Sequence, residues 1–438
     1  MEPPAEVRQR KPQTAKDPGE LQKLSTKPPS EPRLKHGIPM QLLRSLLLIT
    51  WADCCIVVIF VTQVIGAPLY LINKYYYYSF MAYTKQCFGL VLGAVTQWSS
   101  PTLVRVSGDA SVRGQIHLSK DGLLETRFPE RLVMISNHQV YTDWIYLWWV
   151  AYTNEMHGRI FIILKESLKY IPIVGPGMMF YGFIFMARKW TSDKPRLEHR
   201  LEKLKTVYTG SNSARPQYDP MWLLIFPEGT NLSLNTKGRS DLWGKKQGLP
   251  SFKHMILPRS TGLFFCLQQL RGTVDWVYDC TIAYEGPPYV FLSSVPLSFY
   301  WNDTHKAVYR KGSYPDKYFT LRSTYLQGRP PTSVNMHWRR FEISKIPLDD
   351  QKEFEDWLVA RWAEKDQLMD QYFETGRFPS ELAGSIKAEH AVDGQQAAVS
   401  AGYVESHARL HHWSELGLIF VVLVSVACFC KFVTSWMQ

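Results

Sequence analysis

A histidine and an aspartate five positions apart follow an apolar run in the first third of the chain. The run covers residues 132–135 and leads into His138 and Asp143. Imidazole accepts a proton near neutral pH, and a carboxylate can fix its tautomer and stabilise the imidazolium. On one continuous helix, five positions correspond to a rotation of about 140°, which would separate the two side chains. A working pair therefore requires His138 in a turn and Asp143 in the first turn of the next helix.

Such a base suits acyl transfer from a thioester to an alcohol. That reaction also needs stabilisation of the tetrahedral oxyanion and sites for two substrates. The acceptor hydroxyl can attack the thioester directly, so neither a serine nor a cysteine nucleophile is required. Taken alone, the pair is equally compatible with a hydrogen-bonded surface histidine, and the rest of the chain must decide between the two interpretations.

Three later segments also place glycine, proline or charged residues after apolar runs. Residues 182–188 end in Arg188, residues 226–230 read Phe-Pro-Glu-Gly-Thr, and residues 257–262 begin Leu-Pro-Arg. Lys165 follows a further apolar run. Lysine and arginine bind phosphate well, although each of these cations could instead be a solvated surface charge.

With the His138 segment, these three segments resemble the four sequence blocks of the glycerophospholipid acyltransferase family, in the family's order and spacing, over roughly residues 40 to 375. The resemblance implies that His138 and Asp143 are catalytic, that Arg188 and Lys165 contact the phosphate of a lysophospholipid, and that acyl-CoA is the co-substrate. It implies no metal and no prosthetic group. In this resemblance, Gly229 would allow close backbone approach, Glu228 would bond the acceptor's hydroxyl groups and Pro258 would shape the acyl-CoA site. The candidate substrate-binding residues are Lys165, Arg188, Glu228, Gly229, Thr230, Pro258 and Arg259.

The third block departs from the commonest pattern in a way that favours one branch of the family. Where arginine is common, this chain continues with Asn231. With Gln139 after His138 and Lys189 after Arg188, this variant is similar to the lysocardiolipin and lysophosphatidylinositol acyltransferases. Lysophosphatidic acid as the acceptor is the alternative, and a non-catalytic lipid-binding scaffold is a second one.

The segments that must position these residues alternate between strand-like and helical patterns, which predicts an α/β fold. Leucines recur at helical spacing within residues 193–208, with Asp193 as a possible cap. Asp350, followed three residues later by Glu353, predicts the start of another helix. The predicted strands are residues 103–106, 132–136, 160–164, 222–226 and 279–284.

Apolar stretches at both ends predict membrane attachment. Residues 46–72 exceed the roughly 20 residues that a spanning helix needs, and Pro68 should kink or end that helix. Residues 80–98 could complete a hairpin through the membrane, re-enter one leaflet, or form a buried helix. Residues 416–430 predict a tail anchor, with a short amphipathic docking helix as the alternative.

These patterns predict a membrane-anchored protein with an N-terminal membrane helix pair and a C-terminal transmembrane helix. Basic residues before the first apolar stretch place the N-terminus in the cytosol by the positive-inside rule. A returning helix pair would keep the catalytic domain there, and we expect the protein in the endoplasmic reticulum membrane. The expected parts are a disordered basic N-terminus (1–39), the helix pair (40–100), a catalytic domain (101–290), an associated C-terminal region (291–383), a linker (384–412) and a transmembrane tail (413–438).

The net charge of +11 indicates an anionic partner, which could be nucleic acid, an anionic membrane or a phosphate-bearing substrate. Nucleic acid is disfavoured because the basic residues form no RNA-binding motif and the chain has apolar spans. The seven cysteines include no Cys-x-x-Cys pair, so zinc is not expected. The expected partners are therefore acyl-CoA, a lysophospholipid and the bilayer, and the sequence sets no oligomeric state.

Overall fold

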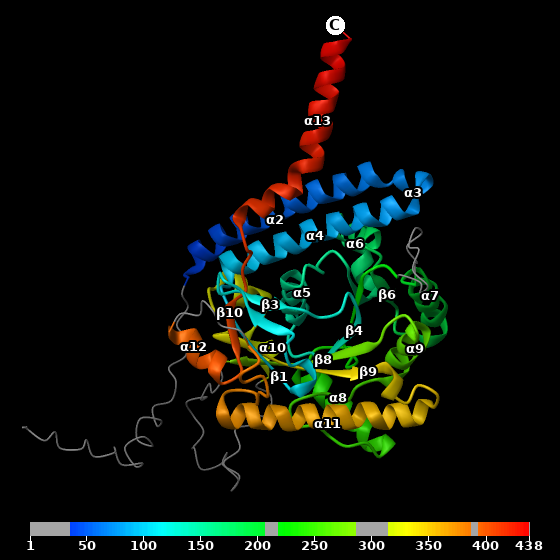
Figure 1. Cartoon of the computed structure of the whole chain (residues 1–438), viewed down its shortest axis with the longest axis vertical. Helices are drawn as coiled ribbons and strands as arrows, with labels where there is room; N and C mark the ends of the chain where they lie inside the picture. Colours follow the sequence, from blue (N-terminus) through cyan, green and yellow to red (C-terminus); the bar gives the residue numbers. More distant parts are fainter. Residues whose placement is uncertain (1–35, 206–217, 286–313, 387–392, 438) are drawn as a thin grey trace, which may run out of the picture.

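A mixed sheet of eight strands forms the centre of the protein in the computed structural model, which describes residues 36–205, 218–285, 314–386 and 393–437 (Figure 1). A separate two-stranded sheet pairs β2 (Ile116–Leu118) with β3 (Leu124–Thr126). The strands of the main sheet are β1 (Leu103–Gly108), β4 (Arg131–Ser136), β5 (Ile160–Lys165), β6 (Ile184–Met186), β7 (Met221–Ile225), β8 (Trp276–Glu285), β9 (Ser333–Glu342) and β10 (Val404–His407).

The strand order is β10-β1-β9-β8-β4-β7-β5-β6. β4, β5, β6, β7 and β8 are mutually parallel, whereas β1 and β9 run the other way. The predicted α/β fold is confirmed, and all five predicted strands are present as β1, β4, β5, β7 and β8. Because parallel strands end at the same edge, the segments that follow β4, β7, β5 and β6 come together there.

Alternate residues of the central strands enter two cores on opposite faces of the sheet, as the two-residue period of a strand dictates. On β4, Leu132 and Met134 pack into one core, and Val133 and Ile135 into the other. Helices α4 (Lys74–Ser99) and α5 (Asp143–Thr153) cover the first face, while α7 (Trp190–Lys203), α9 (Ser260–Leu270) and α11 (Gln351–Thr375) cover the second. The sheet is thus held between two helical layers.

Both predicted helices of the α/β body form, with one correction to a cap. Asp350 caps α11 by accepting hydrogen bonds from the backbone N–H groups of Lys352 and Glu353. In contrast, Asp193 is not the cap of α7, because that helix begins earlier, at Trp190. The Asp193 carboxylate lies in the first turn and reaches back to two backbone N–H groups that precede the helix. Residues 206–208 of the predicted helix lie outside the described residues.

Three apolar helices lie at one end of the molecule (Figure 1). α2 (Ile38–Gly66) is followed by a break at Pro68 and the short α3 (Leu69–Ile72), as the proline predicts. α2 and α4 lie side by side across the α/β body, and α13 (Leu418–Trp436) extends away from them, almost wholly exposed. Within the described part of the chain, only Ile38–Ile72 and Trp413–Trp436 are long and apolar enough to cross a membrane.

The stretch at residues 80–98 forms most of α4, which packs between α2 and α5 and buries residues such as Met81, Leu90 and Val91. Of the three interpretations, a helix buried against the domain describes this segment best. α2, in contrast, leaves leucines such as Leu46 and Leu47 more than 60% exposed. An exposed apolar surface of this kind, beside the projecting α13, suits a lipid environment and indicates a membrane protein.

The C-terminal segments do not form a separate unit. β9, from the predicted C-terminal region, lies between β1 and β8 of the catalytic part. The prediction of a linker over residues 384–412 is wrong for residues 404–407, which form β10 and pair antiparallel with β1. An ion pair of 2.6 Å between Arg105 and Glu405 joins these two strands. Their pairing spans some 300 positions, so no local pattern in the sequence could reveal it.

Candidate active site

His138 and Asp143 are in contact at the carboxyl end of β4. The Nδ1 atom of His138 lies 2.8 Å from the Oδ2 atom of Asp143. Asp143 is the first residue of α5, and His138 lies in the turn between β4 and that helix. The predicted local geometry is confirmed, although the catalytic role of the pair stays a prediction. Because Nδ1 is engaged by the carboxylate, Nε2 is the nitrogen left to accept a proton from a substrate.

Three further donors surround the Asp143 carboxylate, which is completely buried. Oδ2 also accepts hydrogen bonds from the backbone N–H groups of Gln139 (2.6 Å) and Val140 (3.1 Å). Oδ1 accepts one from the hydroxyl of Tyr284, at 2.5 Å. Burial raises the pKa of Tyr284 well above its usual value, so its hydroxyl remains a donor. These contacts stabilise the buried negative charge and fix its direction towards the imidazole.

The turn that carries His138 is anchored on both sides. Asn137 extends the ladder between β4 and β8, because its side-chain amide both accepts from the backbone N–H of Ile282 and donates to its carbonyl. The backbone carbonyl of His138 accepts a hydrogen bond from Leu232. The imidazole stacks on the ring of Phe226, with centroids 4.4 Å apart. The segments after β4 and β7 therefore form one structure around the histidine.

Gly229 is the point at which two candidate cations meet the segment after β7. Its φ of 70° lies in the left-handed region, which glycine adopts without strain. The guanidinium of Arg188 donates to the Gly229 carbonyl at 2.7 Å. Arg259 donates its backbone N–H to the carbonyl of Pro227, and its Cδ atom lies 3.8 Å from the position that a β-carbon at Gly229 would occupy. The structure thus brings the last three predicted blocks together at one glycine.

The backbone of Arg188 is itself unusual, since its φ is 66°. For a residue other than glycine, this conformation costs on the order of 1 kcal/mol, and such strained residues cluster at functional sites. The strain coincides with an exposed side chain that turns towards Gly229. This combination favours a functional role for Arg188 over that of a solvated surface charge.

Lys165 is the last residue of β5 and pairs in register with Met186 of β6, two positions before Arg188. Strand pairing therefore brings the two exposed cations to neighbouring strand ends, at the same edge of the sheet as His138. Ligands of open α/β sheets bind outside this edge. Contact of Lys165 with a phosphate stays a prediction, and no contact among the described residues joins the lysine to the other site residues.

Glu228 lies differently from what a substrate-bonding role suggests. Only 2% of its surface is exposed, and its Oε1 atom accepts a hydrogen bond from the indole N–H of Trp362 in α11, at 3.1 Å. Burial raises the pKa of Glu228 well above its usual value, against the opposing effects of the Trp362 indole and the backbone N–H of His138. Glu228 thus joins α11 to the histidine turn, and its contact with an acceptor stays a prediction.

The remaining predicted residues surround the same turn. Thr230 is half-buried, and Pro258 is buried in the loop before α9. Helix α11 fixes that loop, because Asp366 accepts the backbone N–H groups of Lys253 and His254. Within the described ranges, no group of three or more histidine, cysteine, aspartate or glutamate residues is arranged to hold a metal.

Sequence reasoning missed two residues of this site, Tyr284 and Trp362. Tyr284 lies within a predicted strand, but the strand period alone gives no reason for its hydroxyl to meet Asp143 rather than solvent. Trp362 shares the apolar face of α11 with Phe354 and Leu358, which marks it as a core residue. A buried indole N–H needs a hydrogen-bond acceptor, and this need was the one sequence signal that Trp362 contacts a polar residue of the site.

Two family profiles match the chain. The profile described as Acyltransferase matches residues 112–285, and that described as Acyltransferase C-terminus matches residues 324–398. The first contains every predicted site residue, and the second contains the whole of α11.

Several known proteins are similar over most of the chain. An uncharacterized acyltransferase of Schizosaccharomyces pombe is 37% identical, over 77% of this chain and 87% of its own length. The 2-acyl-1-lysophosphatidylinositol acyltransferase of Saccharomyces cerevisiae is 32% identical, over 80% of this chain and 89% of its own. Lysocardiolipin acyltransferase 1 of Gallus gallus is 31% identical, over 59% of this chain and 58% of its own.

Proposed function

The chain belongs to the glycerophospholipid acyltransferase family and is an O-acyltransferase, and we propose that it transfers an acyl group from acyl-CoA to the free hydroxyl of a lysophospholipid. The observation that carries the proposal is the contact between His138 and the buried Asp143 at the sheet edge where Arg188 meets Gly229. A base and a cationic anchor at the same edge of the sheet are what transfer to a phosphate-bearing alcohol requires.

In the proposed reaction, Nε2 of His138 removes the proton of the acceptor hydroxyl as its oxygen attacks the thioester carbonyl. Asp143 stabilises the imidazolium that forms. When the tetrahedral intermediate collapses, the carbon–sulfur bond breaks and the imidazolium returns its proton to the leaving CoA thiolate. The histidine ends in its starting state, so each cycle yields one ester and one CoA without a covalent enzyme intermediate.

Arg188 is the proposed contact for the phosphate of the acceptor, with Lys165 and Arg259 beside it. Arginine binds phosphate oxygens in a bidentate manner, which orients as well as attracts the substrate. Removing Arg188 should therefore raise the KM for the acceptor more than it lowers kcat. Because Gly229 has no side chain, the acceptor can approach the backbone between the two arginines.

An inositol-bearing or cardiolipin-like lysophospholipid is the proposed acceptor class. Relatives named for lysophosphatidylinositol and lysocardiolipin support this class, and the substitution at Asn231 that separates the chain from the commonest third block agrees with it. A relative from Arabidopsis thaliana is named as a probable 1-acyl-sn-glycerol-3-phosphate acyltransferase, which keeps lysophosphatidic acid as the alternative acceptor.

We place the enzyme in the endoplasmic reticulum membrane, with the exposed face of α2 lying along one leaflet, α4 packed between α2 and the α/β body, and α13 crossing the bilayer. The direction of α13 away from the α2–α4 pair in Figure 1 supports this arrangement. The catalytic part and the start of the chain would then share the cytosolic side. Proteolysis of sealed microsomes checks this topology: the α/β body should be cut, and its protection would reverse the proposed orientation.

The activity is tested with membranes that contain the wild-type chain or His138→Ala, supplied with radiolabelled acyl-CoA and one lysophospholipid at a time. We expect transfer to lysophosphatidylinositol or lysocardiolipin that is lost in the variant, with unchanged protein yield. Preferred transfer to lysophosphatidic acid would support the alternative acceptor. Absence of any His138-dependent transfer would favour a lipid-binding scaffold over an active enzyme.

A further inference from the structure

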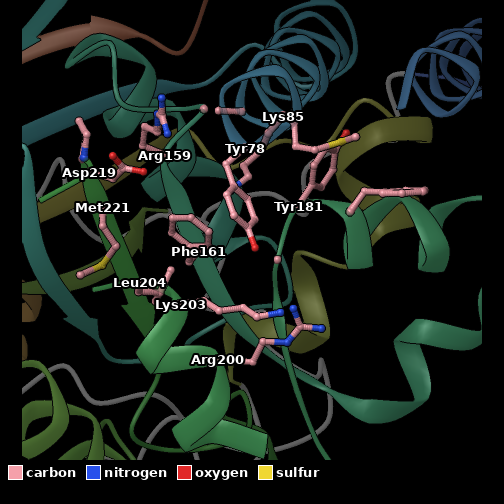
Figure 2. A pocket seen from close by; sticks show the side chains of 16 residues that line it. Tyr78, Lys85, Arg159, Phe161, Tyr181, Arg200, Lys203, Leu204, Asp219 and Met221 are labelled. Carbon is pink, nitrogen blue, oxygen red and sulfur yellow. The ribbon is translucent and has the colours of Figure 1, made fainter. Parts of the chain in front are cut away.

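A cavity lies at the opposite edge of the sheet from His138. Its walls come from the amino ends of β5 and β7, the carboxyl end of α7, and α4 (Figure 2). The space inside is about 70 Å³, more than a single water molecule occupies. In Figure 2, Lys85 and Arg159 lie on one side of the Tyr78 and Phe161 rings, and Arg200 and Lys203 lie on the other.

Strand register separates this cavity from the active site. Ile160, where β5 begins, pairs with Trp222, which pairs with Leu132 of β4. His138 follows Leu132 by six positions, and a strand rises by roughly 3.3 Å per residue, so the two sites lie about 20 Å apart along the sheet. The cavity is therefore not part of the arrangement that holds the proposed acceptor.

Positive charge dominates the lining. Four cations line the cavity, namely Lys85, Arg159, Arg200 and Lys203, against a single acidic side chain, Asp219. Burial raises the pKa of the Asp219 carboxyl group above its usual value, against the opposing effects of Arg159 and Arg131, and this weakens the negative charge of the lining. The cavity consequently attracts an anion, and its mixture of arginine and lysine donors suits phosphate oxygens.

One of the cations is built into the fold. Lys85 is only 2% exposed, and its ammonium donates to the backbone carbonyl of Ile160 at 2.9 Å. It also lies 3.7 Å from the centre of the Phe161 ring. Burial, together with the nearby Arg159, disfavours the charged ammonium and lowers the pKa of Lys85 well below its usual value, so carrying a charge here is costly. An anion in the cavity beside Lys85 would offset this cost.

The surroundings of the cavity indicate the source of the anion. The cavity borders α4, which runs beside the apolar α2, and Tyr78 belongs to the run of four tyrosines at the start of α4. Tyrosines of this kind gather at the interface between lipid and water. Apolar side chains such as Met81 and Phe180 also line the cavity, and they would accommodate the glycerol end of a lipid.

We propose that this cavity, called the basic pocket, binds the phosphate of an anionic phospholipid of the surrounding bilayer. This lipid is distinct from the acceptor that is acylated. The group that the basic pocket would recognise is a phosphate, and a soluble phosphate compound carries the same group. Binding would hold the α/β body against anionic regions of the membrane and would not require the proposed reaction.

The test uses the purified full chain in neutral detergent micelles, with native mass spectrometry to follow the binding of added dioleoylphosphatidic acid. The pocket variant is Arg200→Gln with Lys203→Gln. The matched control, Lys245→Gln with Lys246→Gln, removes the same charge from the exposed surface of α8 (Leu234–Gln247), away from the basic pocket. Thermal unfolding of each variant confirms that it is folded.

We expect the pocket variant to bind phosphatidic acid about 30-fold more weakly, corresponding to roughly 1 kcal/mol for each cation removed. The control should bind as the wild type does, and Arg188→Gln, which changes the proposed acceptor site, should retain the binding that the pocket variant loses. Competition by millimolar inorganic phosphate would identify a soluble phosphate compound as the occupant instead. Equal weakening in the pocket and control variants, or loss of binding in Arg188→Gln alone, would overturn the proposal.

Discussion

Replacement of Asp143 by asparagine tests how the histidine is oriented. In serine proteases, the corresponding change reverses the histidine tautomer and lowers kcat by about ten-thousandfold. The surroundings of Asp143 predict a milder effect. Oδ2 accepts from two backbone N–H groups and from His138, whereas Oδ1 meets only the hydroxyl of Tyr284. A backbone N–H cannot accept a hydrogen bond, so the new amide NH₂ group must face Tyr284, whose hydroxyl can rotate to accept it.

In that orientation, the amide oxygen still accepts from Nδ1 of His138, and Nε2 remains the proton acceptor. The variant loses the negative charge that stabilises the imidazolium but keeps the tautomer. A hydrogen bond to a charged group contributes about 1.5–3 kcal/mol, which corresponds to a loss of roughly 10- to 150-fold in kcat. Asp143→Ala, which removes the acceptor oxygen as well, should lose more activity.

The assay measures CoA release against pH for wild type, Asp143→Asn and Asp143→Ala in the same membranes. The asparagine variant should release CoA more slowly than the wild type, because a neutral amide no longer stabilises the imidazolium that forms during the reaction. A companion variant, Tyr284→Phe, removes the acceptor of the new amide group, so the combination with Asp143→Asn leaves a buried amide donor unpaired and should lose more activity than the two single changes predict. If Asp143→Asn alone is as inactive as His138→Ala, the proposed amide orientation is wrong.

Three further predictions concern the segment after β7. Trp362→Phe removes the indole donor of buried Glu228 and should lower the free energy of unfolding by about 1–3 kcal/mol in a thermal melt, and unchanged stability would argue against this contact. Folding raises the pKa of Glu228, so the folded chain keeps a proton that the unfolded chain releases. The free energy of unfolding should therefore fall as the pH rises above the unfolded pKa of about 4.3. Glu228→Gln should flatten this dependence of stability on pH between pH 5 and 8, and an unchanged slope would contradict the prediction. Gly229→Ala places a methyl group at a φ of 70°, and that group would lie 3.8 Å from Arg259, which is an ordinary contact. The free energy of unfolding should therefore fall by about 1–2 kcal/mol, from backbone strain alone. A larger loss in a thermal melt would indicate a clash.

Local patterns allowed part of the site to be predicted. The His138–Asp143 contact joins a strand end to the next helix, and all of its geometry lies within a few residues, so the spacing alone predicts it. The break at Pro68 and the cap at Asp350 are local in the same sense. Arg188 was predicted through the resemblance, but its strained backbone was not. Its hydrogen bond to Gly229 joins segments about 40 positions apart, and the strand order of the sheet decides that these segments meet.

The sequence by itself determined the α/β fold, the family, the two apolar ends of the chain and the identity of the candidate base, because each rests on residue type and short-range spacing. Only the tertiary structure decided that Glu228 turns inward to Trp362, that Tyr284 completes the surroundings of Asp143, and that β10 belongs to the sheet. The physical reason is common to all three. A buried polar group takes whichever partner the packing of distant segments brings to it, and that choice is made by the assembly of the whole sheet and its helices.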